Sequence, residues 1–280
     1  MAQIWKLNGK YEILNTEQFG EFTNSTLDEI SKRLPGGAYT TFRTYEHFKA
    51  VSIENHIQRL EETAALAGKP VSIDHQKLRN TIREILNHEL TPELRIRITV
   101  DLVDQPGLIY LTYEPLITPA KDLYKTGVET ITANFERKNP KAKLTKFISD
   151  SQSLKTLIHE NLNEILMVNG NGDILEGLTS NFYGVIESKI YTADEGVLLG
   201  ITREALLDEA KKFGFEVVFR PVNLREIENL EEAFLTSSSR NVLPIRKINQ
   251  TTIGNGTPGV VTNKLMELMK KRIISEYEII

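Results

Sequence analysis

The sequence predicts a mixed α/β protein, of the α+β kind, that is divided into two domains. Strand-like and helix-like runs alternate along the chain of 280 residues, and such alternation is typical of mixed folds. A chain of this length forms one large domain or two ordinary ones. The pattern changes near residue 120, where LITPAKDLYKTG reads as a connector. We therefore expect a small N-terminal domain at 1–118, a connector at 119–133 and a larger domain at 134–280.

The first half of the sequence favours strands on both sides of amphipathic helices. Alternating β-branched and aromatic residues indicate strands, and apolar residues at spacings of three and four indicate helices. The expected elements are a hairpin at 5–14, a helix at 26–34, paired strands at 38–51, a helix at 53–68 that Gly68 closes, a helix at 75–90, and strands at 94–103 and 107–116 around a DQPG turn.

The second half favours more strands than helices. The expected elements are a strand at 128–134, an irregular basic stretch at 137–146, a helix at 153–162, strands at 164–169, 180–187 and 189–193, a helix at 202–215, strands at 216–222 and 233–239, and a C-terminal helix. Two domains that meet near residue 120 would favour a ligand site at their junction.

Composition excludes several classes of function. The net charge is −4 and no dense Lys/Arg block occurs, which argues against an electrostatic grip on nucleic acid. No apolar run approaches the length of a membrane span, and the start lacks the layout of a signal peptide, so we expect a cytoplasmic protein. The chain has no cysteine, and its five histidines lack metal-site spacing. We therefore expect neither disulfides nor a metal site.

A carboxylate interrupts two apolar runs in the stretch NGDILEGLTSNFYGV. Glu176 follows Ile174 and Leu175, and a strand-like run resumes at Phe182. A charge in this position is costly to bury unless something pairs with it. The stretch therefore predicts a buried acid with a partner.

Two further stretches have the composition of anion sites. In LLGITREALLDEA, Gly200 and Thr202 stand at the start of a strong helical pattern, where backbone N–H groups can hold an anion. In FLTSSSRNVLPI, four hydroxyls at 236–239 precede Arg240. Taken alone, each stretch is more typical of a helix cap or a turn.

The basic stretch 137–146 could supply a nucleophilic amine. A lysine that is buried can act as a nucleophilic amine, because desolvation lowers its pKa toward neutrality. The candidates are Lys138, Lys141, Lys143 and Lys146. An amine, a buried carboxylate and two phosphate-sized anion sites together suggest pyridoxal phosphate, with the carboxylate holding the pyridine nitrogen protonated.

With these motifs the sequence resembles the class IV (fold type IV) pyridoxal-phosphate aminotransferases, which include branched-chain and D-amino acid aminotransferases and aminodeoxychorismate lyase. The resemblance spans residues 35–262 and rests on YTTFR, NHIQRL, EILMVNGNGDILEGLTSNFYGV, GITRE and EAFLTSSSRNVLPI. It implies a small N-terminal α/β domain, a larger domain with a β-barrel-like sheet, and a homodimer. It also implies ping-pong transfer of an amino group between an amino acid and a 2-oxo acid.

The resemblance assigns the cofactor contacts residue by residue. Glu176 matches the carboxylate that holds the pyridine nitrogen, and Arg59 in HIQRL matches the arginine that holds the cofactor phosphate. Further matches are Ile201 and Thr202 at the helix start, Ser238 at the hydroxyl loop, and Leu198 against the ring. Without the resemblance, Arg59 would be interpreted as a solvated charge and Leu198 as a core residue.

The family spacing favours Lys143 as the catalytic lysine. Lys143 precedes Glu176 by 33 residues, whereas Lys146 precedes it by 30. The residues that follow Lys143, LTKFISD, depart from the family pattern, so Lys146 stays open as a second choice. The resemblance implies that this lysine binds the cofactor and moves the proton of the substrate α-carbon.

Substrate recognition is predicted from charge. Arg95 and Arg97 lie two apart on a strand and so face the same side, either into the site or toward solvent. An arginine can clamp a carboxylate with two bonds. Tyr39 matches an aromatic residue of the substrate pocket, and Ser239 and Arg240 lie in the hydroxyl loop.

A pocket with these arginines and Arg43 would suit a D-amino acid with 2-oxoglutarate, which is the substrate pair we expect from the sequence. The alternatives are a branched-chain L-amino acid and then the lyase reaction. None of the three family patterns is complete: Arg95 replaces the branched-chain pocket tyrosine, VDLVDQPG lacks the arginine and histidine of D-amino acid enzymes, and Ser237 replaces a lyase-like residue. A non-catalytic cofactor-binding protein is disfavoured by the intact Lys143 and Glu176.

Overall fold

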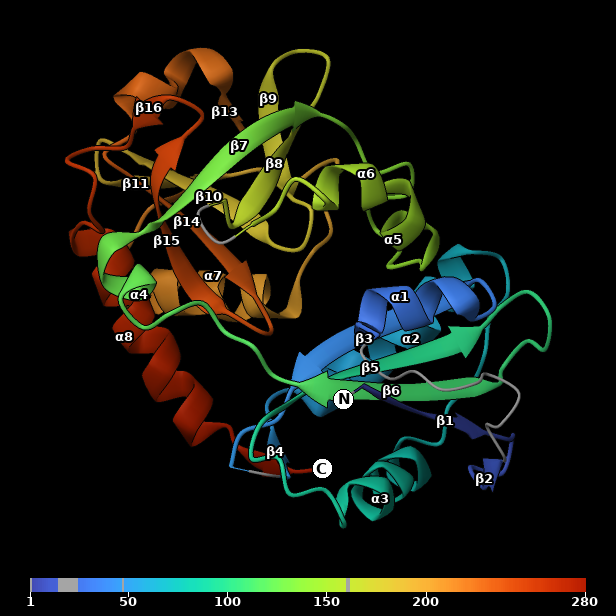
Figure 1. Cartoon of the computed structure of the whole chain (residues 1–280). Coiled ribbons are helices and arrows are strands. Elements are labelled where there is room, and N and C mark those ends of the chain that lie inside the picture. Colours follow the sequence, from blue (N-terminus) through green and yellow to red (C-terminus); the bar gives the residue numbers. More distant parts are fainter. Residues whose placement is uncertain (1, 15–24, 47, 160–161) are drawn as a thin grey trace. The chain divides into compact units, whose positions relative to one another are not determined.

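The computed structural model describes residues 2–14, 25–46, 48–159 and 162–280. They form two compact units (Figure 1). Unit 1 contains Met1–Ile117, Ala142–Asp150 and Glu276–Ile280, and unit 2 contains Thr118–Lys141 and Ser151–Ser275. Residues 142–150 thus pack with the N-terminal part of the chain and not with their neighbours in sequence. The predicted domain limits, 1–118 and 134–280, remain predictions.

Unit 1 is built on an antiparallel sheet in the order β2-β1-β6-β5-β3. Its strands are β1 (Gln3–Leu7), β2 (Ile13–Leu14), β3 (Gly37–Arg43), β5 (Leu94–Asp101) and β6 (Ile109–Pro115). Its helices are α1 (Leu27–Arg33), α2 (Ile53–Leu66), α3 (His75–Leu86) and the short α5 (Lys146–Asp150). A separate pair joins β4 (Lys49–Ala50) to β17 (Glu278–Ile279).

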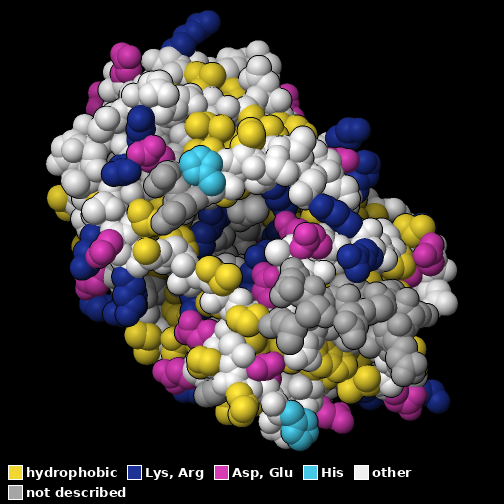
Figure 2. All heavy atoms as spheres, in the orientation of Figure 1, with side chains coloured by type: hydrophobic (Ala, Val, Ile, Leu, Met, Phe, Trp, Pro, Cys, Tyr) yellow, Lys and Arg dark blue, Asp and Glu magenta, His cyan; other side chains and the backbone are white. Residues whose placement is uncertain are grey.

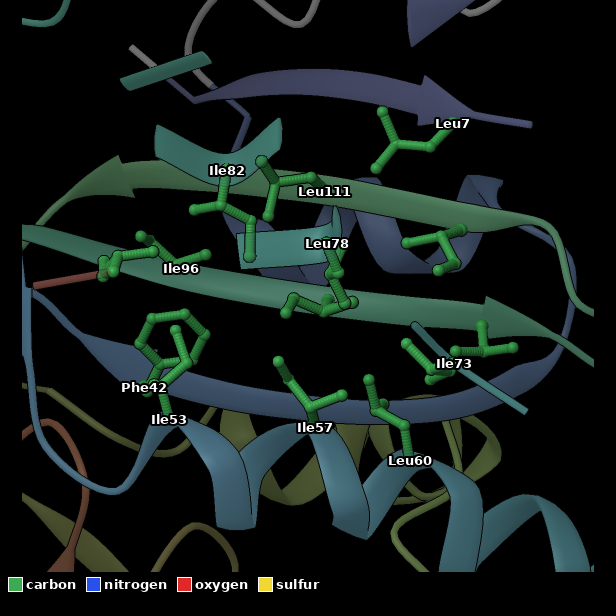
Figure 3. Close-up of a cluster of buried hydrophobic side chains, with 14 of the residues drawn as sticks. Leu7, Phe42, Ile53, Ile57, Leu60, Ile73, Leu78, Ile82, Ile96 and Leu111 are labelled. Carbon is green, nitrogen blue, oxygen red and sulfur yellow. The ribbon is translucent and has the colours of Figure 1, made fainter. Parts of the chain in front are cut away.

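Alternation along the strands gives the sheet of unit 1 one apolar and one polar face. The apolar face carries Phe42, Ile96 and Leu111, and α2 and α3 contribute Ile57 and Leu78 to the same core (Figure 3). The polar face carries the side chains that alternate with these residues: Tyr39, Thr41, Arg95, Arg97 and Thr99. The predicted placement of Arg95 and Arg97 on one side of their strand is confirmed.

Helix α2 forms where the sequence pattern predicts it. Its buried positions, which include Ile53, Ile57 and Leu60, follow the helical spacing, and Gly68 at φ 73° supplies the left-handed residue just after the helix. Ser52 makes no side-chain cap; instead the Ile53 N–H donates to the carboxylate of Glu278. The C-terminal segment therefore supports the first turn of α2.

Unit 2 is built around a closed barrel. The sheet runs β12-β11-β10-β14-β15-β7-β8-β9-β13, and an additional pairing of β9 with β10 closes it. Its strands are β7 (Val128–Asn134), β8 (Glu164–Val168), β9 (Asp173–Gly177), β10 (Asn181–Ile186), β11 (Lys189–Thr192), β12 (Val217–Phe219), β13 (Val222–Asn223), β14 (Glu232–Ser237), β15 (Asn241–Ile248) and β16 (Thr251–Thr252). The expected barrel-like sheet in the larger part of the chain is confirmed.

Helices lie outside this sheet. They are α4 (Leu123–Thr126), α6 (Gln152–Lys155), α7 (Ile201–Phe213), α8 (Val260–Ser275) and the 3₁₀ helix η2 (Leu224–Asn229). The helix predicted at 153–162 is wrong in its extent, since α6 ends at Lys155. The Thr156 hydroxyl donates to the Ser153 carbonyl, and such side-chain bonds compete with helix propagation. Residues 160–161 of that prediction lie outside the described residues.

The surface mixes charges of both signs. On the face in Figure 2, basic and acidic side chains of the described residues are interspersed, in line with the net charge of −4. Among the described residues, none of the helices combines the length and apolar character that a membrane crossing requires.

Candidate active site

The predicted site residues divide between the two units. Unit 1 contains Tyr39, Arg59, Arg95, Arg97 and Lys143, and unit 2 contains Glu176, Leu198, Ile201, Thr202, Ser238, Ser239 and Arg240.

The Lys143 backbone is fixed to the edge of the unit 1 sheet. Its carbonyl accepts from the Tyr39 N–H at 2.9 Å, and its own N–H donates to the Thr63 hydroxyl of α2 at 3.3 Å. Two residues on, the Thr145 N–H donates to the Gly37 carbonyl, and the Gly37 N–H donates to the Thr145 hydroxyl. These four hydrogen bonds fix the backbone on both sides of Lys143.

Gly37 is required at this edge because of a close backbone approach. A Cβ at this position would lie 1.9 Å from the Val100 carbonyl oxygen on the neighbouring strand. Any other residue would separate β3 from β5 at the point where the Lys143 segment attaches.

The surroundings of Lys143 and Lys146 differ. Lys143 is partly buried, and its Nζ lies 4.9 Å from the centre of the Tyr39 ring. The Lys146 side chain is 68% exposed, and its Nζ pairs with Asp150 at 2.6 Å. An exposed amine in an ion pair lacks the burial that activates a nucleophilic lysine. These environments favour Lys143 as the reactive amine.

One face of α2 carries three polar residues toward the Lys143 segment. His56, Arg59 and Thr63 are spaced by three and four residues, and so lie on the same side of the helix. The buried His56 shares a hydrogen bond with the Thr40 hydroxyl at 2.7 Å. Burial, with the positive charges of Arg59 and Lys143, lowers the pKa of His56 to about 3. His56 is therefore neutral near pH 7, and its environment brings Arg59 and Lys143 into one neighbourhood of unit 1.

The arginines on the polar face of the sheet are already paired with acids. The Arg95 guanidinium lies 2.9 Å from Glu114, and the buried Arg97 guanidinium lies 2.8 Å from Asp28 of α1. Arg97 also donates to three oxygens: the Leu27 carbonyl, the Ser31 hydroxyl and the Thr41 hydroxyl. This pairing argues against a role for either guanidinium as the carboxylate clamp expected from the sequence.

In unit 2, Glu176 is buried at the pairing of β9 with β10 that closes the barrel, and both of its oxygens accept hydrogen bonds. Oε1 accepts from Nε of Arg137 at 3.0 Å, and Oε2 accepts from the Asn181 amide at 3.2 Å and the Leu198 N–H at 3.1 Å. These donors satisfy a negatively charged carboxylate. The acid between two apolar runs therefore has partners within the protein; its pairing with the pyridine nitrogen of a cofactor remains a prediction.

Sequence reasoning missed Arg137. This residue opens the basic stretch, whose other cations made it look like one more solvated charge. It is buried, whereas Lys138, Lys141 and Lys146 are exposed. Burial was not visible from composition, but the position of Arg137 just beyond the end of β7 at Asn134 could have been noted.

The hydroxyls of the EGLTSN stretch donate hydrogen bonds to a second buried acid, Glu164. Thr179 and Ser180 donate to Glu164 at 2.6 and 2.9 Å, and the Arg240 guanidinium donates to the same carboxylate at 2.7 Å. Burial raises the pKa of Glu164, but the charge of Arg240 and these hydrogen bonds outweigh it and hold that pKa below its usual value. Arg240 also donates to the Ser237 hydroxyl. Its predicted contact with substrate is therefore less favoured than a role in fixing the hydroxyl loop.

The N-terminus of α7 faces that hydroxyl loop. Ile201 is the first residue of α7, and the Thr202 hydroxyl lies 3.5 Å from the Ser238 hydroxyl. Gly200 precedes the helix and provides no side-chain cap; a Cβ there would lie 2.4 Å from the Asn181 side-chain oxygen. Helix N–H groups and hydroxyls together suit a phosphate. Unit 2 thus brings together three of the predicted phosphate ligands.

Leu198 and Ser239 complete the predicted set in unit 2. Leu198 is buried, and its backbone holds two site residues, since its N–H donates to Glu176 and its carbonyl accepts from Asn181. Ser239 is partly buried at the tip of the loop between β14 and β15.

A family model described as amino-transferase class IV matches residues 37–248, which is most of the chain. The chain belongs to the class IV aminotransferases. It is therefore a pyridoxal-phosphate-dependent aminotransferase, since this cofactor is the one that the family uses. Each unit by itself holds groups that suit this cofactor: unit 1 has a lysine on a fixed backbone and an arginine on α2, and unit 2 has a buried carboxylate and a helix N-terminus beside hydroxyls.

Curated relatives of this class IV aminotransferase carry different activities in their names. A probable branched-chain-amino-acid aminotransferase of Thermotoga maritima is 31% identical over 254 residues, which cover 86% of this chain and 90% of that protein. A D-alanine aminotransferase of Bacillus licheniformis is 26% identical over 262 residues, covering 86% and 88%. An aminodeoxychorismate lyase of Bacillus subtilis is 26% identical over 257 residues, covering 85% of each chain.

Solved structures support the same fold. A putative branched-chain amino acid aminotransferase from Thermotoga maritima matches with a TM-score of 0.79 at 27% identity, covering 98% of this chain and 96% of that one. The Escherichia coli branched-chain amino acid aminotransferase matches with a TM-score of 0.77 at 19% identity, covering 98% and 95%. The predicted fold type is confirmed.

Proposed function

We propose that this aminotransferase moves the amino group of a neutral, aliphatic L-amino acid of the branched-chain type to a 2-oxo acid. The observation that carries the proposal is the likeness to a relative named as a branched-chain enzyme, which covers 86% of this chain; the pairing of all four arginines from which the sequence predicted an acidic substrate bears on the side chain of the substrate and not on its handedness. The ion pairs are Arg43 with Glu93, Arg95 with Glu114, Arg97 with Asp28, and Arg240 with Glu164. To bind a second carboxylate of the substrate, any of these four arginines would have to exchange its acid partner. The branched-chain name of the Thermotoga relative, at 31% identity, supports the same substrate class.

Each site residue has a proposed role. Bound pyridoxal phosphate supplies a ring that accepts electrons from the substrate α-carbon. Lys143 would bind the cofactor covalently, and once the substrate amine has displaced it, its free Nζ would carry the proton that leaves the α-carbon. Glu176 holds the proton on the ring nitrogen. The residues that would hold the phosphate are Arg59 in unit 1 and Ile201, Thr202 and Ser238 in unit 2, and Leu198 would contact the ring. Tyr39 lines the substrate pocket, and Ser239 stays a candidate contact of the substrate.

The second candidate is the D-amino acid activity expected from the sequence, which the name of the D-alanine aminotransferase relative supports at 26% identity. The lyase reaction is third. The cofactor and the chemistry of the α-carbon are common to all three, so the distinction lies in the substrate pocket.

Single-turnover kinetics distinguish these candidates. We expect L-leucine to convert the cofactor to its aminated form at least about tenfold faster than D-alanine or D-glutamate, a difference of about 1.4 kcal/mol in barrier. The absorbance of the cofactor reports each half-reaction. Glu114→Gln tests whether the ion pair of Arg95 keeps acidic substrates out. Because this change removes the acid that pairs with Arg95, it should raise the rate with an acidic amino acid relative to the rate with L-leucine. Faster conversion by D-alanine or D-glutamate in the wild-type protein would favour the D-amino acid reading instead.

We also propose that the smallest active unit is a homodimer, as the family resemblance implies. Two modest domains gain stability from the additional surface that a dimer buries. Sedimentation at assay concentration is expected to give a dimer, and a fully active monomer would contradict the proposal. A cytoplasmic location remains a prediction.

A further inference from the structure

The ring of Tyr39 lies beside two cations. The Nζ of Lys143 is 4.9 Å from the ring centre, and Cζ of Arg97 is 5.0 Å from it. The tyrosine is 6% exposed, so these contacts are shielded from water. All three residues belong to unit 1. A cation within about 6 Å of an aromatic centre is attracted by the ring, and more strongly where water is excluded.

Arg97 is held too firmly to be a mobile ligand for substrate. It is 3% exposed, and its guanidinium contacts oxygens from both α1 and β3. The ion pair with Asp28 also offsets its charge. Without that offset, Arg97 and Lys143 would repel each other across a single ring.

The Lys143 side chain, by contrast, extends from a backbone that β3 and α2 hold in place. The Tyr39 N–H donates to the Lys143 carbonyl, so the ring and the amine are carried by hydrogen-bonded neighbours. The two backbones therefore keep a constant relation, and the lysine side chain can return its amine to the same ring after its torsions change.

We propose that Tyr39 is a positioning residue that seats the Lys143 ammonium group whenever this amine is not bonded to the cofactor, and that Arg97, locked to α1, keeps the ring in place. The inference rests on the proposed role of Lys143. Under this inference Arg97 holds the Tyr39 ring, whereas the sequence predicted that it binds the substrate carboxylate. It also makes the Tyr39 ring, rather than its hydroxyl, the group that matters to the lysine.

The test measures how readily the Lys143 amine is modified as pH changes. Full-length protein freed of cofactor is treated with acetic anhydride over a pH series, and the acetylated Lys143 peptide is quantified by mass spectrometry. In Tyr39→Leu the ammonium loses the ring, so the midpoint of labelling should fall by about half to one pH unit. Tyr39→Phe keeps the ring and should keep the wild-type midpoint. Looser packing alone would raise the labelling plateau without moving the midpoint.

Asp28→Asn is a second variant that leaves the ring intact. It removes the charge that offsets Arg97, so the midpoint should again fall, because a nearby uncompensated cation disfavours the ammonium. This variant keeps the inference testable if Tyr39→Leu does not fold. The proposed role of Tyr39 would be overturned if the labelling midpoint of Lys143 were the same in wild type and Asp28→Asn. It would also be overturned if Tyr39→Leu and Tyr39→Phe had the same midpoint.

The same labelling experiment with added cofactor distinguishes a failure of this inference from a failure of the proposed function. Adding pyridoxal phosphate to the wild-type protein should protect Lys143 from acetylation. If Lys143 stays reactive while another lysine is protected, the proposed role of Lys143 fails. If Lys143 is protected but its labelling midpoint does not change when the Tyr39 ring is removed, only the proposed role of Tyr39 fails.

Discussion

Lys143→Ala is expected to lower the rate of amino transfer by about a hundredfold to ten-thousandfold, since the reaction loses its proton carrier at the α-carbon. The fold should survive, because the hydrogen bonds of this segment involve the backbone of residue 143 and not its side chain. Stopped-flow absorbance with a saturating amino acid measures the rate, and a thermal melt checks the fold.

Lys146→Ala is the matched control for this variant. The Lys146 amine is exposed and paired with Asp150, one turn along α5, so its loss should change the rate by less than about twofold; exposed pairs of this kind contribute little. An inactive Lys146→Ala beside an active Lys143→Ala would move the catalytic role to Lys146, the second choice from the sequence.

Glu176→Gln is expected to lower the half-reaction rate by about a hundredfold or more, because a neutral amide does not keep the ring nitrogen protonated. The same change should lower the free energy of unfolding by about 3 kcal/mol, because Arg137 then stays buried without its counter-charge. The nearly equal shape of the two side chains would suggest little loss of stability; the buried contact with Arg137 changes that expectation. Rates are measured per folded molecule, and stability by denaturant unfolding.

The double variant Glu176→Gln with Arg137→Leu separates the two effects. Removing the uncompensated cation should restore part of the stability and none of the rate. A single Glu176→Gln variant that unfolds readily, yet has a normal rate per folded molecule, would mark Glu176 as a structural acid.

Local patterns in the sequence predicted the parts of the fold that depend on neighbouring residues. The spacing of Ile53, Ile57 and Leu60 predicts α2, and Gly68 predicts where it stops, because both signals act within a few turns of helix. The alternation around Arg95 and Arg97 likewise predicts their common face. The helix predicted at 153–162 was wrong in its extent: beyond Lys155 the Leu157 and Ile158 N–H groups donate to carbonyls three residues back, which is the pattern of a tighter turn.

Pairings between distant residues could not be read from the sequence. Arg97 meets Asp28 and Arg240 meets Glu164 only after the sheets form. Each arginine therefore looked available for substrate until its acid partner was located. The burial of Arg137 was hidden by the basic residues that follow it, and no local signal indicates that residues 142–150 pack with the N-terminal unit. The closed barrel was implied by the family resemblance and not by strand patterns alone.

We propose that Lys143 is the lysine of this class IV aminotransferase that binds pyridoxal phosphate, and reduction by borohydride identifies the bonded lysine. Borohydride fixes the cofactor to the lysine that it is bonded to, and peptide mapping by mass spectrometry locates the adduct. The account predicts a yellow protein that bleaches on reduction and a single adduct on Lys143. An adduct on Lys146 would contradict the assignment of the lysine, and a protein that takes up no cofactor on reconstitution would contradict the proposed chemistry as a whole.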